Sequence, residues 1–241
     1  MGIYSLCLQV DCEFVLKVII FGNGSIAELV DYYFSIDSEH EVVAFTVDKQ
    51  FANEKTFMGK PLVPFEEILD IYPPSDYGMF VALGYGKLNK DREKKYIEAK
   101  LLNYEFPSYV SSMSAIARNV KIGENCLILE NQTIQPFCKI GDNVTLWSGN
   151  HIGHHSTISN HTFISSHVVV SGHCLIGERC FLGVNACIRD GITLGNDVFV
   201  GMAAQVAKKL QDGAIVMSKP DEIIDDSDRR ASVIKRAFFS N

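Results

Sequence analysis

Six of the chain's seven histidines lie between residues 151 and 173, close enough in sequence to form a reactive site. They are His151, His154, His155, His161, His167 and His173. A neutral imidazole, with an ordinary pKa near 6.5, can accept a proton at physiological pH, and imidazole is also the commonest metal ligand. Which chemistry is available depends on which rings share a face, and therefore on the element that carries them.

A six-residue period defines that element. Every sixth residue from Val110 to Val206 is Ile, Val or Leu. No helical period gives this spacing, whereas a parallel β-helix does, because each hexapeptide forms one short strand and one corner. The pattern predicts the left-handed hexapeptide form, with three hexapeptides in each coil. Residues 18 apart would then be neighbours in the stack, about 4.8 Å apart.

The residues two before each aliphatic position also point inward and are usually small. Four of them are cysteines, Cys126, Cys138, Cys174 and Cys180. We interpret these thiols as filler of a narrow core rather than as nucleophiles or metal ligands.

The same count sorts the histidines. His155, His161, His167 and His173 are six residues apart, so they point in different directions around the prism. Only His155 and His173, one coil apart, could share a side, and a zinc site needs three or four convergent ligands. The sequence therefore predicts no metal site within one chain. His154 is out of this phase and is the candidate for proton transfer.

The N-terminal half alternates apolar runs with helical patterns. A strand and a helix are expected in "LKVIIFGNGSIAELVDYYF" from residue 16, followed by strands at 41–47 and 79–84 and helices at 64–72 and 89–102. This order predicts a small Rossmann-like parallel sheet covered by helices.

Three glycine turns are expected at one edge of that sheet. "GNGSIA" fits the G-x-G-x-x-G/A pattern, in which Gly22 and Gly24 let backbone N–H groups approach a phosphate at a helix N-terminus. Gly84 follows a later strand, and Asp48 lies near where an acid would bond a ribose hydroxyl. A dinucleotide is conceivable, and a nucleotide-containing ligand is favoured over none.

The charge and hydropathy of the chain limit the classes of partner that we expect it to bind. The formal charge of −7 argues against nucleic acid, which requires clustered Lys and Arg. No apolar run approaches the ~20 residues that span a bilayer, and "MGIYSLCLQVDCEF" lacks the positive charge of a signal peptide. We expect a cytoplasmic protein with free thiols. The predicted divisions are an extension (1–16), the Rossmann-like domain (17–106), the β-helix (107–208) and a tail (209–241), whose 231–239 stretch could form an amphipathic helix.

A small glycine-turn α/β domain joined to a hexapeptide β-helix resembles bacterial nucleotide-sugar N-acyltransferases, in particular those that acetylate UDP-4-amino-sugars during bacillosamine synthesis. It is also similar to sialic acid O-acetyltransferase-like proteins. The likeness spans nearly all of residues 17–208, and its most specific parts are "GHHSTIS" and "IGERCFLGVNACIRDGITLG". It implies an acyl-CoA-dependent N-acyltransferase of surface polysaccharide or glycan synthesis, such as O-antigen or lipopolysaccharide.

The resemblance also implies a homotrimer with acyl-CoA in the groove between subunits, no metal, and a UDP- or dTDP-linked amino sugar. His154 matches the family's general base, and Gly172 matches a glycine beside the thioester that would bind the oxyanion. Pantetheine would lie near Val184 and Met202. The nucleotide sugar would be bound by Gly22, Gly24, Asp48, Gly84, Trp147, Asn150, His155 and Phe163.

The chain departs from the family at four places. Gly153 replaces the acid that orients the family's histidine, so His154 must be oriented by His155 or by a neighbouring subunit. Trp147 replaces an asparagine and Phe163 a second histidine, which reshapes the sugar pocket. The family's C-terminal G-x-P-A-K/R pattern reads "SKPDE" here.

Two other functions stay open. One is O-acylation of a sugar hydroxyl, which would need the base more strongly because an alcohol is a poorer nucleophile than an amine. The other is a metal-dependent β-helix protein resembling the γ-class carbonic anhydrases, which place histidines between subunits.

Overall fold

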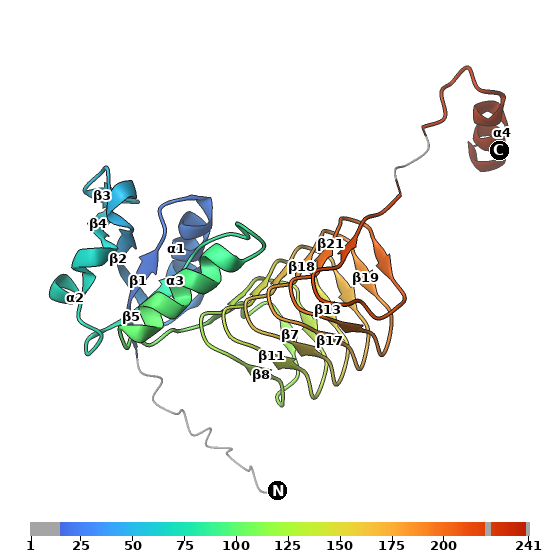
Figure 1. Ribbon diagram of the computed structural model, residues 1–241. Helices are drawn as coiled ribbons and strands as arrows, with labels where there is room; N and C mark the ends of the chain where they lie inside the picture. Colours follow the sequence, from blue (N-terminus) through green and yellow to red (C-terminus); the bar gives the residue numbers. More distant parts are fainter. Residues whose placement is uncertain (1–14, 220–222, 240–241) are drawn as a thin grey trace, which may run out of the picture.

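The structure is a computed structural model that describes residues 15–219 and 223–239. It consists of a small α/β domain followed by a long prism of stacked coils (Figure 1). Among the described residues, no helix combines the length and apolarity required to cross a bilayer.

The α/β domain is built on a five-stranded sheet with the order β3-β4-β2-β1-β5. All neighbours are parallel except the β3–β4 pair. The elements are β1 (Lys17–Phe21), α1 (Ser25–Asp37), β2 (Glu41–Val47), η1 (Lys49–Phe51), β3 (Thr56–Phe57), β4 (Lys60–Pro64), η2 (Phe65–Glu67), α2 (Ile68–Ile71), β5 (Tyr77–Val81) and α3 (Lys90–Leu101).

The Rossmann-like prediction is confirmed, with differences in detail. The expected helix at 64–72 is a 3₁₀ turn followed by the single turn α2, and the strand expected at 79–84 is β5, which begins at Tyr77. Apolar side chains on the two faces of the sheet form two cores, one under α1 and one under α3. Because these cores bury β1, β2 and β5, the carboxyl ends of the three strands are fixed at one edge of the sheet.

The second part is a left-handed β-helix with three parallel sheets of two-residue strands. The first face contains β6 (Tyr109–Val110), β9 (Leu127–Ile128), β12 (Thr145–Leu146), β15 (Phe163–Ile164), β18 (Phe181–Leu182), β21 (Phe199–Val200) and β23 (Ile215–Val216). The second contains β7 (Ala115–Ile116), β10 (Thr133–Ile134), β13 (His151–Ile152), β16 (Val169–Val170), β19 (Cys187–Ile188) and β22 (Gln205–Val206). The third contains β8 (Lys121–Ile122), β11 (Lys139–Ile140), β14 (Thr157–Ile158), β17 (Leu175–Ile176) and β20 (Thr193–Leu194).

The register confirms the 18-residue coil. Ile134 pairs with Ile152, and Ile152 with Val170. The aliphatic positions form one continuous core. The four inward cysteines are 0–2% exposed, and burial raises the pKa of each thiol, to about 12 for Cys126 and about 11 for Cys180. They are therefore protonated filler, as expected.

Most corners of the β-helix contain one residue with left-handed backbone geometry. Residues with positive φ recur every six positions through most of the stack, and His155, His161, His167 and His173 occupy four of these corners. Asn, Asp and His are enriched in this conformation, because their side chains tolerate it better than most. The repeat-phased histidines are thus explained by backbone geometry alone.

Helix α3 joins the two parts. Arg92 is fully buried and donates from Nη2 to the carbonyl oxygen of His161 at 2.8 Å. Asn89 donates from Nδ2 to the carbonyl oxygen of Cys180 at 3.0 Å. In the opposite direction, Arg179 donates from Nη1 to Glu93 Oε1 at 2.9 Å. These contacts fix the α/β domain against the first face of the β-helix.

The ends of the β-helix differ from the predicted boundaries. Strand β23 pairs with β21, so residues up to Val216, predicted as tail, extend the stack. The expected helix near the C-terminus is α4 (Arg229–Phe239). Nearly all of the predicted extension at 1–16 lies outside the described residues.

Candidate functional site

The glycine turns predicted from sequence line one cavity of about 630 Å³. It lies at the carboxyl ends of β1, β2 and β5 and includes Gly22, Gly24, Asp48 and Gly84. Gly22 has φ +135°, and a Cβ there would lie 2.9 Å from the carbonyl oxygen of Ala82, so only glycine fits. Gly24 precedes α1 and has open space around it. The turn thus leaves the N-terminus of α1 facing the cavity.

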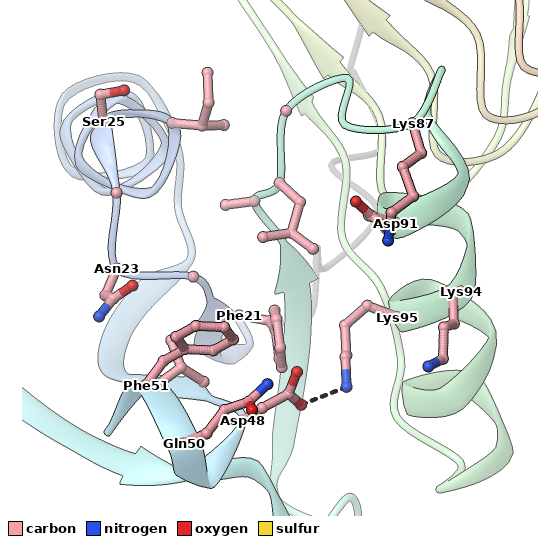
Figure 2. A pocket seen from close by; sticks show the side chains of 17 residues that line it. Phe21, Asn23, Ser25, Asp48, Gln50, Phe51, Lys87, Asp91, Lys94 and Lys95 are labelled. Carbon is pink, nitrogen blue, oxygen red and sulfur yellow. Dashed lines mark hydrogen bonds and ion pairs between the residues drawn. The ribbon is translucent and has the colours of Figure 1, made fainter. Parts of the chain in front are cut away.

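Lysines from α3 form the opposite wall (Figure 2). Lys95 lies 2.6 Å from Asp48 and 2.5 Å from Glu98. Burial opposes charge on Lys95, but the hydrogen bonds that Lys95 donates to these two carboxylates, together with their negative charge, outweigh burial and raise the pKa of Lys95. Lys87 and Lys94 also line the cavity. Helix N-termini and lysines both attract anions, so the wall suits a phosphate-bearing ligand.

A second hollow of about 420 Å³ lies along the corner between the first and second faces of the β-helix. We call it the aromatic groove. Its lining residues are Tyr85, Trp147, Phe163, Ser165, Ser166, Phe181, Gly183, Val184, Phe199 and Met202. It brings together Trp147 and Phe163, predicted for the sugar, and Val184 and Met202, predicted for pantetheine.

The groove's aromatic wall follows the coil repeat. Phe163 stacks on Phe181 at 5.6 Å between ring centroids, and Phe181 on Phe199 at 5.3 Å. Tyr85, from the loop after β5, packs against Phe163 and Phe181. Since Gly84 and Lys87 of the same loop line the first cavity, residues 84–87 border both hollows.

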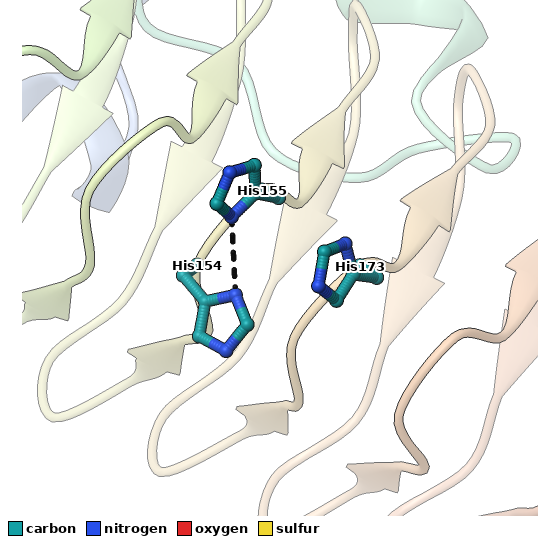
Figure 3. Close-up of side chains that lie close together, drawn as sticks. All are labelled: His154, His155 and His173. Atoms are coloured by element: carbon teal, nitrogen blue, oxygen red, sulfur yellow. Dashed lines mark hydrogen bonds between the residues drawn. The ribbon is translucent and has the colours of Figure 1, made fainter.

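His154, His155 and His173 lie together at another corner, between the second and third faces (Figure 3). All three are exposed. The Nδ1 atoms of His154 and His155 are 3.1 Å apart. The His155 ring stacks on His173 at 4.9 Å and on Phe137 at 4.7 Å. The sequence predicted the His155–His173 pair and offered His155 as a partner of His154, but not that all three rings would converge.

Gly172 lies beside His154, as the predicted pairing requires. A Cβ on Gly172 would be 3.0 Å from His154 Nε2 and also 3.0 Å from Asp190 Oδ1. Among the residues that the structure describes, the Gly172 N–H donates no hydrogen bond. The corner therefore places an imidazole nitrogen near an unpaired backbone donor.

Gly153, which stands where the resembled family has an orienting acid, has no room for a side chain. A Cβ there would lie 2.5 Å from the backbone nitrogen of Gly172. In this backbone, any side chain at residue 153 would press on the N–H that the site leaves unpaired. His155 is the polar group that meets the other side of the His154 ring.

Asn150 does not fit its predicted contact with a sugar. It is 1% exposed, its amide donates to the carbonyl oxygen of Trp147, and its Oδ1 accepts from Val168 N at 2.7 Å. Its side chain closes the turn between two coils. We therefore correct its assignment from substrate contact to structural support.

Sequence reasoning missed several residues that the fold brings to these sites. Asp190 lies 18 residues after Gly172, and Phe181 and Phe199 continue the series from Phe163. Extending each candidate by whole coils would have found all three. Lys87, Lys94 and Lys95 needed the fold, because no repeat relates them to the glycine turns.

Comparison with known proteins supports the repeat and the fold. Residues 119–154 and 137–172 match the model of the bacterial transferase hexapeptide (six repeats), and residues 175–204 match that of the hexapeptide repeat of succinyl-transferase. No curated protein matches the chain in sequence.

Solved structures resemble nearly the whole molecule. Perosamine N-acetyltransferase from Caulobacter crescentus, solved as a mutant with CoA and GDP-perosamine, superposes with a TM-score of 0.75 at 23% identity, over 85% of this chain and 97% of that one. The acetyltransferase domain of PglB from Neisseria gonorrhoeae gives 0.74 at 21%, over 86% and 99%. WeeI from Acinetobacter baumannii gives 0.64 at 19%, over 86% and 99%. At these identities the likeness establishes the fold.

Proposed function

We propose that this chain transfers an acyl group from acyl-CoA to the amino group of a nucleotide-linked amino-dideoxy-sugar. The observation that carries this proposal is the loop 84–87, which borders both the lysine-lined cavity and the aromatic groove. A ligand with a diphosphate at one end and a sugar at the other would follow that loop from one hollow to the next. Similar folds that bind CoA and GDP-perosamine support this reading.

The nucleotide belongs in the first cavity. The diphosphate would meet the N-terminus of α1 at Gly22 and Gly24, with Lys87 and Lys94 opposite. Asp48 shares one carboxylate oxygen with Lys95 and has a second oxygen for a hydroxyl or a base. The expected nucleotides are UDP and dTDP, and GDP joins them because of the perosamine enzyme.

The reaction needs a base and an oxyanion donor. The sugar nitrogen attacks the thioester carbonyl, forming the C–N bond, while His154 accepts the proton that the nitrogen loses. The Gly172 N–H bonds the oxyanion, which then collapses, breaking the C–S bond and releasing CoA as the thiol once it is protonated. Direct attack is favoured because burial keeps the core cysteines protonated.

A complete site requires more than one copy of the chain. His154 follows a strand of the second face, whereas Val184 and Met202 follow strands of the first, so base and groove lie at different corners of one prism. Threefold packing of parallel prisms would bring the corner of one copy to the groove of the next. We therefore propose a homotrimer with acyl-CoA between subunits and no metal in the reaction. A cytoplasmic location is part of the same proposal, since acyl-CoA and nucleotide sugars would be its substrates.

The decisive test is product analysis with and without the base. Wild-type protein is incubated with acetyl-CoA and larger acyl-CoAs, against UDP-, dTDP- and GDP-linked sugars bearing either an amine or a hydroxyl, and products are read by mass spectrometry. We expect an amide product, and a 10²–10⁴-fold lower kcat for His154→Asn, the range of a general base.

His167→Asn is the matched control, because His167 is an exposed histidine that lies outside the His154 cluster and does not line the aromatic groove. An ester product would show that the protein acylates a sugar hydroxyl rather than the proposed amine. Wild-type turnover by folded His154→Asn protein would remove the base from the mechanism.

A further inference from the structure

We propose that His154, His155 and His173 bind one divalent transition-metal ion, and that the bound ion switches off His154. One ligand atom from each residue can be chosen so that all three lie within 4.8 Å of one another. Three imidazoles that converge in this way supply three of the four positions of a tetrahedral site. The second part of the proposal rests on the proposed function, whereas the binding itself does not.

The spacing of the nitrogens suits a metal. With metal–nitrogen bonds of 2.0–2.1 Å, two ligands of a tetrahedral ion are about 3.3 Å apart. The Nδ1 atoms of His154 and His155 are already 3.1 Å apart. Closing His173 onto the same ion requires a shift of at most about 1.5 Å, which rotation of an exposed side chain supplies.

The fold holds two of the three ligands in place before any ion binds. His155 and His173 occupy equivalent left-handed corners of successive coils, and their rings are stacked with an interplanar angle of 18°. Phe137, one coil earlier, stacks on the other side of His155. Because these rings are already ordered by stacking, ligation costs less conformational entropy than it would on a mobile loop.

The donor set selects the class of ion. Imidazole suits Zn²⁺, Co²⁺, Ni²⁺ and Cu²⁺, whereas Mg²⁺ and Ca²⁺ prefer oxygen ligands. Asp190 lies on the Nε2 side of His154, on the far side of Gly172. A carboxylate in that place could accept the Nε2–H of a histidine ligated through Nδ1, the usual outer support of a ligated histidine.

Metal binding and proton acceptance exclude each other at His154. A neutral imidazole has one lone pair available for bonding, and its other nitrogen carries hydrogen. If Nδ1 ligates the ion, Nε2 carries the hydrogen and cannot accept a proton from the sugar amine. The ion would therefore act as a reversible inhibitor.

Direct binding measurements test the site. Untagged full-length protein, stripped with a chelator, is titrated with ZnCl₂ by calorimetry, and the bound metal is counted by elemental analysis after gel filtration. We expect one ion per chain. Co²⁺ should give the visible absorption of a tetrahedral, nitrogen-ligated ion.

Matched variants assign the ligands. His173→Asn keeps a residue that tolerates the left-handed corner, and we expect at least a tenfold loss of affinity. His167→Asn makes the same substitution at an exposed corner outside the cluster and should bind as wild type does. Binding that is substoichiometric, or equal in wild type and His173→Asn, would overturn the site.

Initial rates test the switch, taken before released CoA thiol competes for the ion. Zn²⁺ should inhibit wild type, a chelator should restore turnover, and His173→Asn should need at least tenfold more Zn²⁺ for half-inhibition. If the ion binds through all three histidines while turnover continues, the site stands and the role of His154 as base fails.

Discussion

His154 is held between two neighbours, one at each ring nitrogen. Its Nδ1 faces His155 at 3.1 Å, and its Nε2 lies beside Gly172. One of the two facing Nδ1 atoms must carry the hydrogen of that bond. When His155 donates it, His154 carries its own hydrogen on Nε2; when His154 donates, its Nε2 is free to accept a proton. The second arrangement is the one that the proposed reaction needs, so we propose that His155 is a positioning residue rather than the substrate contact expected from the sequence.

Replacing His155 tests this role. His155→Phe keeps a ring stacked between Phe137 and His173 but removes the nitrogen, and Phe137 shows that phenylalanine occupies this type of corner. We expect kcat to fall by roughly tenfold to a hundredfold, the usual cost of removing a group that orients a functional imidazole, with little change in either KM. Steady-state kinetics measures both.

His155→Asn serves as the rescue variant. Its amide oxygen can accept a bond from His154, and asparagine tolerates the positive φ of this corner. Part of the lost kcat should return. Unchanged kcat in His155→Phe would show that a neighbouring copy of the chain orients His154.

At the level of single residues, the sequence predicted what lies on the repeat and missed what depends on side-chain direction. The His154–Gly172 pair was predicted and is observed as neighbours. Asn150 was assigned to a substrate because it precedes the histidines, but its side chain turns inward to bond backbone groups. The six-residue count already placed it inward, because Asn150 is two residues before the aliphatic Ile152.

The six-residue spacing of the histidines resembles a functional motif, but the backbone geometry of the corners explains it. His161 and His167 share positive φ with asparagines and an aspartate at equivalent corners. For most side chains this conformation is costly, and for β-branched ones it is a true outlier. The corners therefore select residue type independently of any reaction.

Substitutions at His167 measure this selection. His167→Val should lower the free energy of unfolding by about 1–3 kcal/mol, because a β-branched residue is strained at φ +57°. His167→Asn should change it by less than about 0.5 kcal/mol. Urea titrations followed by circular dichroism give both values. Equal stabilities for the two variants would mean that the backbone relaxes at this corner.

The elements were predictable wherever the period was regular. The aliphatic period gave the strands of the coils from β6 to β22, because burial recurs at fixed spacing. Val200 pairs with Val216, only 16 residues later, so the last coil is shorter and the count of six does not reach it. The two-residue strand β3 has no pattern of its own, and its pairing with β4 depends on the tertiary fold.

The whole molecule separates the proposed base from the proposed acyl-CoA groove. One chain has His154 at one corner of the prism and the aromatic groove at another, while α3 fixes the nucleotide cavity to the first face. Each proposed site would then use a base from one copy and a groove from the next. Such a shared site permits a complementation test.

Two inactive variants should restore activity when they assemble together. His154→Ala removes the base, and Met202→Trp fills the groove at a position that is 66% exposed in the single chain. Trimers formed by refolding an equal mixture should have about a quarter of their sites intact, since random assortment pairs an intact base with an intact groove that often.

Mixing the folded variants without refolding is the control, because we expect little exchange of subunits between folded copies of the proposed trimer. Recovery near a quarter of wild-type turnover supports the shared site. Zero recovery after confirmed mixed assembly would place base and groove in the same chain.

The 18-residue ladder also bears on how the chain tolerates changes in length. His154, Gly172 and Asp190 belong to three successive coils, and each is one full circuit of the backbone, 18 residues, from the next. A single-residue insertion between His154 and Gly172 would rotate all later side chains out of register and dismantle both corners. Duplication of a complete circuit beyond Asp190 would lengthen the prism while leaving the chemistry where it is, so this architecture can grow only in whole units.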